Sequence, residues 1–371
     1  MSVLDKIPLN TNDVSKFLKE EQEFLKGFIE QLEKIDSSSL TAKRAEIVSG
    51  LIQLLPPEID KIFPMKIPQS QIQALLSIAK TLGGAFSKNN VNQLGIQNKW
   101  ILLDDGYLGS FVNEDHEIAI LLYLIASIYH SQALKHVQTS PQYRYYFISA
   151  FSALKGAIAF IEKLSPDEEH TAYPFYQTLL LRKLEVEAEL TKSEAFVARK
   201  KGDFETASKL FAGTASYRFS MMNFTLPEES DNQVKIYAST ELGMACFYIA
   251  VGLSNVDDNE QSYLYLLKAR SYFENAAKLS ENNTELLESA NKRLDLVNPY
   301  IDRIKDSIEK IDKKIDEIPD PQPMMIHPDP EPLFFPGDKS EGQTRICSNC
   351  HKKVIWADKC SECNEAIIPF E

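Results

Sequence analysis

Apolar residues along most of this chain recur every three or four positions, the spacing that places them on one face of an α-helix. After residue 114 this pattern continues for about 200 residues, interrupted only by short polar turns. Two helices are expected within 12–55 and one more over 69–82, on either side of a proline-rich break. The later helices are predicted over 115–138, 142–164, 171–201, 203–222, 231–254, 259–280 and 283–317. The chain is therefore predicted to be mostly α-helical.

The stretch between residues 83 and 114 breaks the helical pattern. Gly, Asn and Asp residues punctuate it, and Trp100–Leu103 is a short apolar run between turn-forming residues. We therefore predict a small β element near residues 98–112.

One turn resembles the junction between paired helices in tetratricopeptide repeats. In the run Arg199–Phe211, a Gly-Asp turn is followed by an aromatic residue and then by small residues where helices would cross. The run Ser262–Leu279 resembles the second helix of such a pair. No strict period holds over three repeats, so we predict an irregular helical solenoid with a tetratricopeptide-like core.

A proline-rich segment follows the helices. Residues 319–336 hold seven of the 18 prolines of the chain, and proline removes an amide donor and ends a helix. Met324, Leu333 and Phe334 make the segment too apolar for a free linker, so we interpret it as an arm partly packed on the helices. The predicted organisation is a helical domain over 1–318, an arm and linker over 319–344, and a C-terminal module over 345–371.

The C-terminal module carries the clearest chemical signal in the sequence. Four of the five cysteines form two CxxC pairs separated by nine residues, namely Cys347, Cys350, Cys360 and Cys363. Two such pairs can hold one Zn²⁺ with four thiolates, and this closed coordination leaves no position for a reacting water. We therefore predict one structural zinc ion in a small zinc ribbon. His351 and Asn364, the residues that follow the two pairs, are expected to adopt positive φ.

Catalytic motifs are missing from the helical part of the sequence. His116-Glu117 begins like a metalloprotease helix, but Ile120 stands where the second His is needed. The sequence has no glycine-rich phosphate loop and no G-x-S-x-G motif. Cys246 lies in an apolar run, which predicts a buried structural thiol rather than a nucleophile. We therefore expect a protein that is not an enzyme.

Charge and targeting signals narrow the function further. The formal net charge of −13 argues against a general nucleic-acid binder, because such proteins are usually basic. The N-terminus lacks a secretory hydrophobic segment, and the longest apolar run, Ile118–Ile128, is shorter than the roughly 20 residues that cross a bilayer. Clustered CxxC pairs without an export signal indicate a metal site rather than disulfides. We expect a cytoplasmic protein.

The order of these elements resembles the Bro domain of ALIX-type adaptors of the ESCRT machinery. Ile7–Thr11 resembles the extended entry of that domain, and Glu117–Ser127 resembles its most recognisable helix. Phe147–Leu164 is similar to the helix that follows, and Ser208–Leu210 with Tyr217 looks like the helix that lines the partner groove of the family. The resemblance implies a curved helical solenoid. A terminal zinc ribbon is not part of the usual domain, and the combination resembles an archaeal relative of the family.

The resemblance implies a non-enzymatic adaptor that binds the C-terminal amphipathic helix of an ESCRT-III filament subunit in a helical groove. It also allows membrane contact through one basic face of the domain. Leu210 matches a groove leucine, Phe196 or Ala195 falls where an aromatic is expected, and Thr206 stands where a larger aliphatic is usual. The expected partner-binding residues are Leu210, Phe196, Thr206, Phe204, Arg199, Lys200 and Lys209. The alternative is that Leu210 and Phe196 are ordinary core residues and that the basic run is a solvated turn.

The zinc ribbon is expected to act as a second recognition module, for ubiquitin or for another protein. A rival interpretation is a general tetratricopeptide-like scaffold whose ribbon contacts nucleic acid or another machine, although the net charge disfavours nucleic acid. The apolar residues of the ribbon exceed what so small a module can bury, so some of them should contact a partner or the helical body. These residues are Trp356, Ile367, Ile368 and Phe370.

Overall fold

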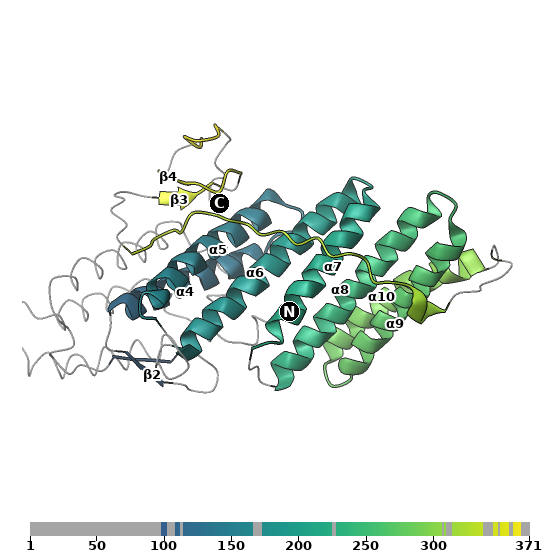
Figure 1. Cartoon of the computed structure of the whole chain (residues 1–371), viewed down its shortest axis with the longest axis horizontal. Helices are drawn as coiled ribbons and strands as arrows, with labels where there is room; N and C mark the ends of the chain where they lie inside the picture. The colour runs from purple at the N-terminus through teal and green to yellow at the C-terminus, as the bar shows by residue number, and fades with distance from the viewer. Residues whose placement is uncertain are drawn as a thin grey trace, which may run out of the picture. The chain divides into compact units, whose positions relative to one another are not determined.

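The structure is a computed structural model of the chain, shown in Figure 1. It describes residues 98–101, 108–111, 114–165, 173–224, 228–305, 308, 314–336, 344–347, 349–355 and 359–364. The chain divides into two compact units. The first comprises Met1–His136, Pro141–Lys183 and Asp329–Glu371, and the second comprises Val137–Ser140 and Leu184–Pro328.

The first unit contains a short hairpin and two helices packed against each other. Strands β1 (Asn98–Ile101) and β2 (Leu108–Phe111) pair antiparallel, which confirms the predicted β element. Phe147 and Phe151 on the second of the two helices are at most 2% exposed and lie in the core. The helices that the structure describes in this unit are α4 (Glu114–Ala133), α5 (Pro141–Glu162) and the first part of α6 (Tyr173–Lys200).

The second unit is a row of helices in which each packs against the next along the chain, from α7 to α10 (Figure 1). Asp203 and Asp258 cap α7 and α9, because their carboxylates accept the backbone N–H groups that the first helical turn leaves unpaired. The elements of this unit are the rest of α6, α7 (Phe204–Met221), α8 (Glu228–Ser254), α9 (Asn259–Leu279), α10 (Thr284–Lys305) and the 3₁₀ turn η4 (Ile315–Glu317).

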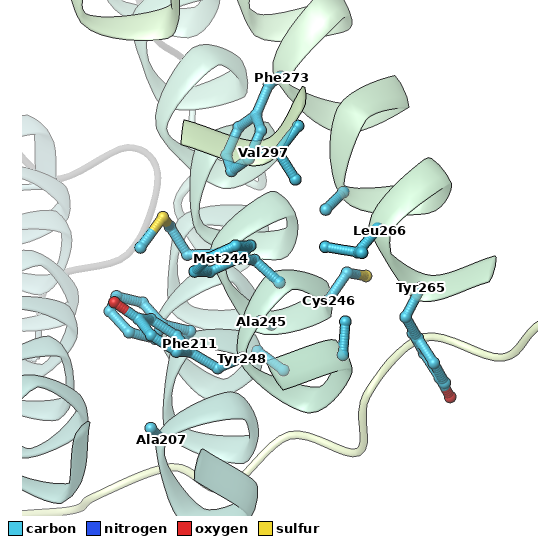
Figure 2. Close-up of a cluster of buried hydrophobic side chains, with 14 of the residues drawn as sticks. Ala207, Phe211, Met244, Ala245, Cys246, Tyr248, Tyr265, Leu266, Phe273 and Val297 are labelled. Carbon is cyan, nitrogen blue, oxygen red and sulfur yellow. The ribbon is translucent and has the colours of Figure 1, made fainter. Parts of the chain in front are cut away.

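The core of the second unit is centred on α8, as Figure 2 shows. Phe211 and Tyr248 stack on one side of that helix, and Phe273 packs so closely on the other that its ring lies over Gly243. Cys246 is fully buried among them, which confirms the predicted structural thiol. Burial raises the pKa of this thiol to about 12, so it stays protonated and unreactive at neutral pH.

The predicted helices α4 to α9 are confirmed, with ends that differ by a few residues. The predicted helix over 283–317 is too long, because the described helix α10 ends at Lys305. Lys314 has an extended backbone with ψ 154°, so the residues that follow form only a short 3₁₀ turn. The helices expected over 12–55 and 69–82 lie outside the described residues.

One described helix is long and apolar enough to cross a membrane. This is Ser230–Ser254 in α8, and 56% of its most apolar window is buried inside the protein. The central helix of a folded core is long, apolar and buried in the same way. The length and composition of this helix are therefore only weak evidence that it spans a membrane.

Candidate partner-binding face and metal centre

An aromatic cluster joins the C-terminal end of α6 to α7 and α8. The ring of Phe196 meets that of Phe211 edge-on, with centroids 5.2 Å apart. Phe211 stacks on Tyr248 at 5.4 Å, and Tyr248 stacks in turn on Phe204 at 6.3 Å. Aromatic pairs of this geometry stabilise by about 0.5–1.5 kcal/mol each beyond their buried area. The cluster therefore fixes the α6–α7 turn on α8 and brings the predicted residues Phe196 and Phe204 to one place.

Arg199 covers this aromatic cluster from the solvent side. Its Nη1 donates to the Tyr248 hydroxyl at 3.2 Å, and its guanidinium lies 5.7 Å from the centre of the Phe196 ring. Burial raises the pKa of Tyr248, and the Arg199 hydrogen bond partly offsets that effect. Arg199 itself is exposed, so it can also meet an acidic partner.

The two predicted lysines have local partners. Lys200 Nζ donates to the Thr139 hydroxyl at 2.7 Å, and Lys209 Nζ pairs with Glu205 at 2.6 Å, one helical turn away. Exposed pairs of this kind contribute little to stability, so either lysine can exchange its partner for another acceptor.

Thr206 and Leu210 occupy different environments on α7. The Thr206 N–H donates to Asp203 Oδ1 at 3.0 Å, which lowers the pKa of that carboxyl, and the Thr206 side chain is half-buried. Leu210 is 3% exposed and belongs to the hydrophobic core. A charge at Leu210 would disturb folding before binding, so a substitution there cannot test the predicted groove. The full set of partner-binding residues stays a prediction.

A cavity of about 70 Å³ lies beside the aromatic cluster, between α6, α7, α8 and α10. Its apolar wall includes Phe196, Phe211, Met244 and Leu286. Its polar side is formed by Lys192, Tyr237, Thr240, Glu241, Ser289 and Arg293. Sequence periodicity did not indicate this cavity, because its lining comes from four different helices.

A buried ion network lies behind the polar side of the cavity. Arg218 is 1% exposed, and its guanidinium pairs with Glu189 at 2.5 Å and with Glu241 at 3.6 Å. Lys192 completes the network through Glu241 at 3.3 Å. Burial alone would lower the pKa of Arg218, but the surrounding carboxylates outweigh burial and raise it. The network therefore stays ionised and fixes α6, α7 and α8 together.

The first part of the proline-rich arm lies on α7 in the second unit. The Met324 N–H donates to the backbone carbonyl of Lys209 at 2.8 Å, and the Tyr217 hydroxyl donates to the Ile326 carbonyl at 2.7 Å. Gly213 makes this close approach feasible, because a Cβ at that position would lie 2.0 Å from the Met324 oxygen.

The later part of the arm lies on α5 in the first unit. The Leu333 N–H donates to the backbone carbonyl of Ser152 at 3.1 Å. The Ser152 hydroxyl in turn donates to the backbone carbonyl of Glu331 at 2.5 Å. Leu333 and Phe334 are 2% and 5% exposed, and the Phe334 ring packs against that of Phe160. The arm is thus fixed both by backbone hydrogen bonds and by buried apolar side chains.

The four cysteines of the tail come together as a candidate metal centre. Their Sγ atoms all lie within 4.8 Å of one another, and the Cys347–Cys363 and Cys350–Cys360 pairs are 3.7 and 3.6 Å apart. A tetrahedron of thiolates at the usual Zn–S distance of about 2.3 Å requires sulfur atoms about 3.8 Å apart. The four residues therefore fit a metal ion that takes tetrahedral sulfur coordination.

The backbone around the cysteines supports the same conclusion. His351 and Asn364 both have φ 60°, as predicted from their positions after the two pairs. Each also donates its N–H to the carbonyl of the first cysteine of its pair, at 2.9 Å. Strands β3 (Thr344–Ile346) and β4 (Lys353–Ile355) form a hairpin around the first pair. Trp356, Ile367, Ile368 and Phe370 lie outside the described residues.

Glu331 connects the arm to the cysteine module. Its backbone N–H donates to the His351 carbonyl at 3.0 Å, and its carboxylate accepts the Lys353 N–H at 2.7 Å and Lys352 Nζ at 3.0 Å. The Lys353 N–H is the main cause of the lowered pKa of Glu331. Sequence reasoning missed this contact, because a glutamate in a proline-rich segment carries no signal of its partner.

Comparison with known proteins gives a fold but no close relative. No protein-family model matches the chain, and no curated protein matches it. Solved structures do match. A complex described as "ALIX BRO1 CHMP4C complex" has a TM-score of 0.58 and 14% identity, covering 88% of this chain and 92% of that one.

Two further structures support the same fold. ALIX in complex with the SIVmac239 PYKEVTEDL late domain has a TM-score of 0.54 and 13% identity, covering 87% of this chain and 46% of that one. A structure described as the basis for endosomal targeting by the Bro1 domain has a TM-score of 0.51 and 11% identity, covering 86% and 89%. The protein therefore has a Bro1-like, mostly helical fold, with a cysteine cluster suited to a metal in its tail.

Proposed function

We propose that this protein is a non-enzymatic, cytoplasmic ESCRT-associated adaptor that binds the C-terminal amphipathic helix of an ESCRT-III filament subunit. The observation that supports it most is the fold likeness to a Bro1 domain in complex with CHMP4C, over 88% of this chain. The archaeal origin suggested by the added ribbon belongs to the same proposal, as does peripheral contact with membranes.

The aromatic cluster on α6, α7 and α8 supplies a local reason for the proposal. A helical partner is recognised when its apolar side chains enter preformed sites and its flanking charges set the register. Phe196 is half-buried and forms one wall of the cavity, and Arg199 is exposed beside it. These two residues therefore join an apolar site to a positive charge within reach of one bound helix.

Isothermal titration calorimetry of the full chain tests this proposal. The probes are synthetic C-terminal helices of the ESCRT-III subunits encoded in the same genome. Phe196→Ala should weaken binding about tenfold or more, because it removes an aromatic wall of the site. Arg199→Gln should weaken binding less and make it less dependent on salt.

Lys278→Gln on α9 is the matched control for the charge change, since it removes an exposed positive charge outside the aromatic cluster. It should leave the affinity unchanged. If the folded wild-type chain binds none of the ESCRT-III helices, the proposal is wrong. Equal affinities of wild type and Phe196→Ala would place the binding face elsewhere.

The cysteine module is proposed to hold one structural Zn²⁺ and to act as a second recognition module for ubiquitin or another protein. Bound zinc would supply a crosslink between the two CxxC pairs, which a module of this size needs in order to fold. Metal analysis should find one zinc per chain. An NMR titration with ubiquitin tests the partner, and unchanged spectra of the ribbon would exclude ubiquitin.

A further inference from the structure

The cavity between α6, α7, α8 and α10 combines an apolar wall with a positive charge. Lys192 and Arg293 contribute +2 to its lining and Glu241 contributes −1, which leaves +1. The whole chain carries −13, so this is a positive site in an acidic protein. Lys192, Phe196 and Arg293 are only half-buried, which means that the cavity can be reached from solvent.

The charges in this cavity differ in how they are paired. Glu241 already has two cations, Lys192 Nζ at 3.3 Å and Arg218 Nε at 3.6 Å. Arg293 forms no ion pair with any carboxylate in the described part of the chain. Its Nη1 donates instead to the carbonyl and hydroxyl of Ser289, at 2.7 and 2.6 Å. The guanidinium therefore retains donors for an outside acceptor.

The environment of Arg293 favours an anionic acceptor. Burial lowers the pKa of this guanidinium, and the charge of Glu241 offsets that effect only in part. A further carboxylate placed against the guanidinium would replace the interactions with water that burial removes. A guanidinium can donate two parallel hydrogen bonds to one carboxylate, which makes the interaction both directional and strong. A free anion would gain nothing from Phe196 and Leu286, which belong to the apolar lining of the same cavity. The occupant must therefore carry an apolar group beside its carboxylate.

We infer that this cavity takes an apolar side chain of an acidic partner helix, with a carboxylate three or four positions away along that helix pairing with Arg293. Residues at this spacing lie on one helix face, so one turn of the partner presents both groups together. The inference rests on the proposed function and deepens it, because it names the charge that the bound helix must carry. Arg293 is thereby a specificity-determining residue of the binding site.

A double-mutant cycle by fluorescence anisotropy tests this assignment. The probes are labelled C-terminal ESCRT-III helices that bind the wild-type chain, each with its acidic residues changed to Gln one at a time. Arg293→Gln should weaken binding of the parent helix about tenfold to a hundredfold, the effect of a charge-assisted hydrogen-bond pair. Arg293→Gln should not weaken binding any further when the partner helix already lacks the carboxylate that pairs with Arg293.

The control is Arg303→Gln, on the same helix but with its guanidinium stacked on Tyr300, outside the cavity lining. The peptide substitutions need no change in the protein, so they decide the question even if Arg293→Gln is unstable. If a helix binds and none of its carboxylates matters, the inference is wrong and the proposed function stands. If no ESCRT-III helix binds at all, both are wrong.

Discussion

Replacing Gly156 by alanine tests whether the proline-rich arm is fixed on α5. A Cβ at this position would lie 2.2 Å from the carbonyl oxygen of Phe334 and 3.1 Å from a methyl group of Leu122. The Leu122 side chain can turn aside, but the backbone oxygen can move only with the arm. The arm must therefore lift from the helix or shift along it.

The loss in free energy of unfolding can be worked out from the side chains that the arm buries on α5 and from its hydrogen bonds. Leu333 and Phe334 are almost fully buried, and each such side chain stabilises by about 1.5–3 kcal/mol. The two hydrogen bonds to Ser152 contribute about 1 kcal/mol each. Complete release would therefore lose about 5–8 kcal/mol, offset by up to about 1 kcal/mol from the better helix propensity of alanine. Because a shifted arm keeps part of its burial, we expect a loss of about 2–4 kcal/mol.

Gly252→Ala on α8 is the matched control. The nearest atom to its added Cβ is the Cβ of Phe204, 3.5 Å away, which is an ordinary contact. Helix propensity should then stabilise this variant by about 0.5–1 kcal/mol. Urea denaturation gives the free energy of unfolding, and hydrogen exchange at the Leu333 amide reports the arm directly. If Gly156→Ala is as stable as Gly252→Ala and its arm amides remain protected, the arm does not lie on α5.

Three further outcomes are expected. Arg218→Met removes the buried guanidinium that Glu189 and Glu241 share and leaves them only Lys192, at 4.0 and 3.3 Å. It should lower the free energy of unfolding, measured in urea, by about 3–5 kcal/mol, and an unchanged midpoint would contradict the network. Removing zinc with a chelator, or changing Cys360 to Ser, should unfold the tail and speed hydrogen exchange at the arm amides. If the arm amides stay protected from exchange, the arm does not need the metal. The pKa of Glu331 lies below its ordinary 4.5, so this carboxylate stabilises the arm above that pH, and the contribution is lost as the pH falls through the lowered pKa. Proteolysis of the arm by pepsin should therefore accelerate more in wild type than in Glu331→Gln as the pH falls below 4.5.

The helices could be predicted because their signal is local. A period of three or four residues marks the buried face of α9, and Gly202-Asp203 marks the turn before α7. The same holds for the tail, since the spacing of the cysteines defines the metal centre and the positive φ of His351 and Asn364. The helix predicted up to residue 317 failed because periodicity alone does not show where the chain becomes extended.

The remaining features depend on contacts between distant segments. Nothing near Gly156 in the sequence shows that a carbonyl of the arm will lie on it. The charge on Arg293 is informative only once its neighbours are known, because most surface arginines pair with an acid nearby. Leu210 could be matched to a groove residue by analogy, but its burial could be established only from the packing of α7 on α8.

The order of synthesis gives the contact between α5 and the arm a consequence for folding. Ser152 and its partner Glu331 are 179 residues apart in the chain. At about 5–20 residues per second, the ribosome needs roughly 9–36 s to make the second after the first. During that time the apolar surface of α5 that Leu333 and Phe334 cover is exposed to solvent and to other nascent chains. Chains truncated before the arm should therefore aggregate more readily than full-length chains, even though every helix of the body is present.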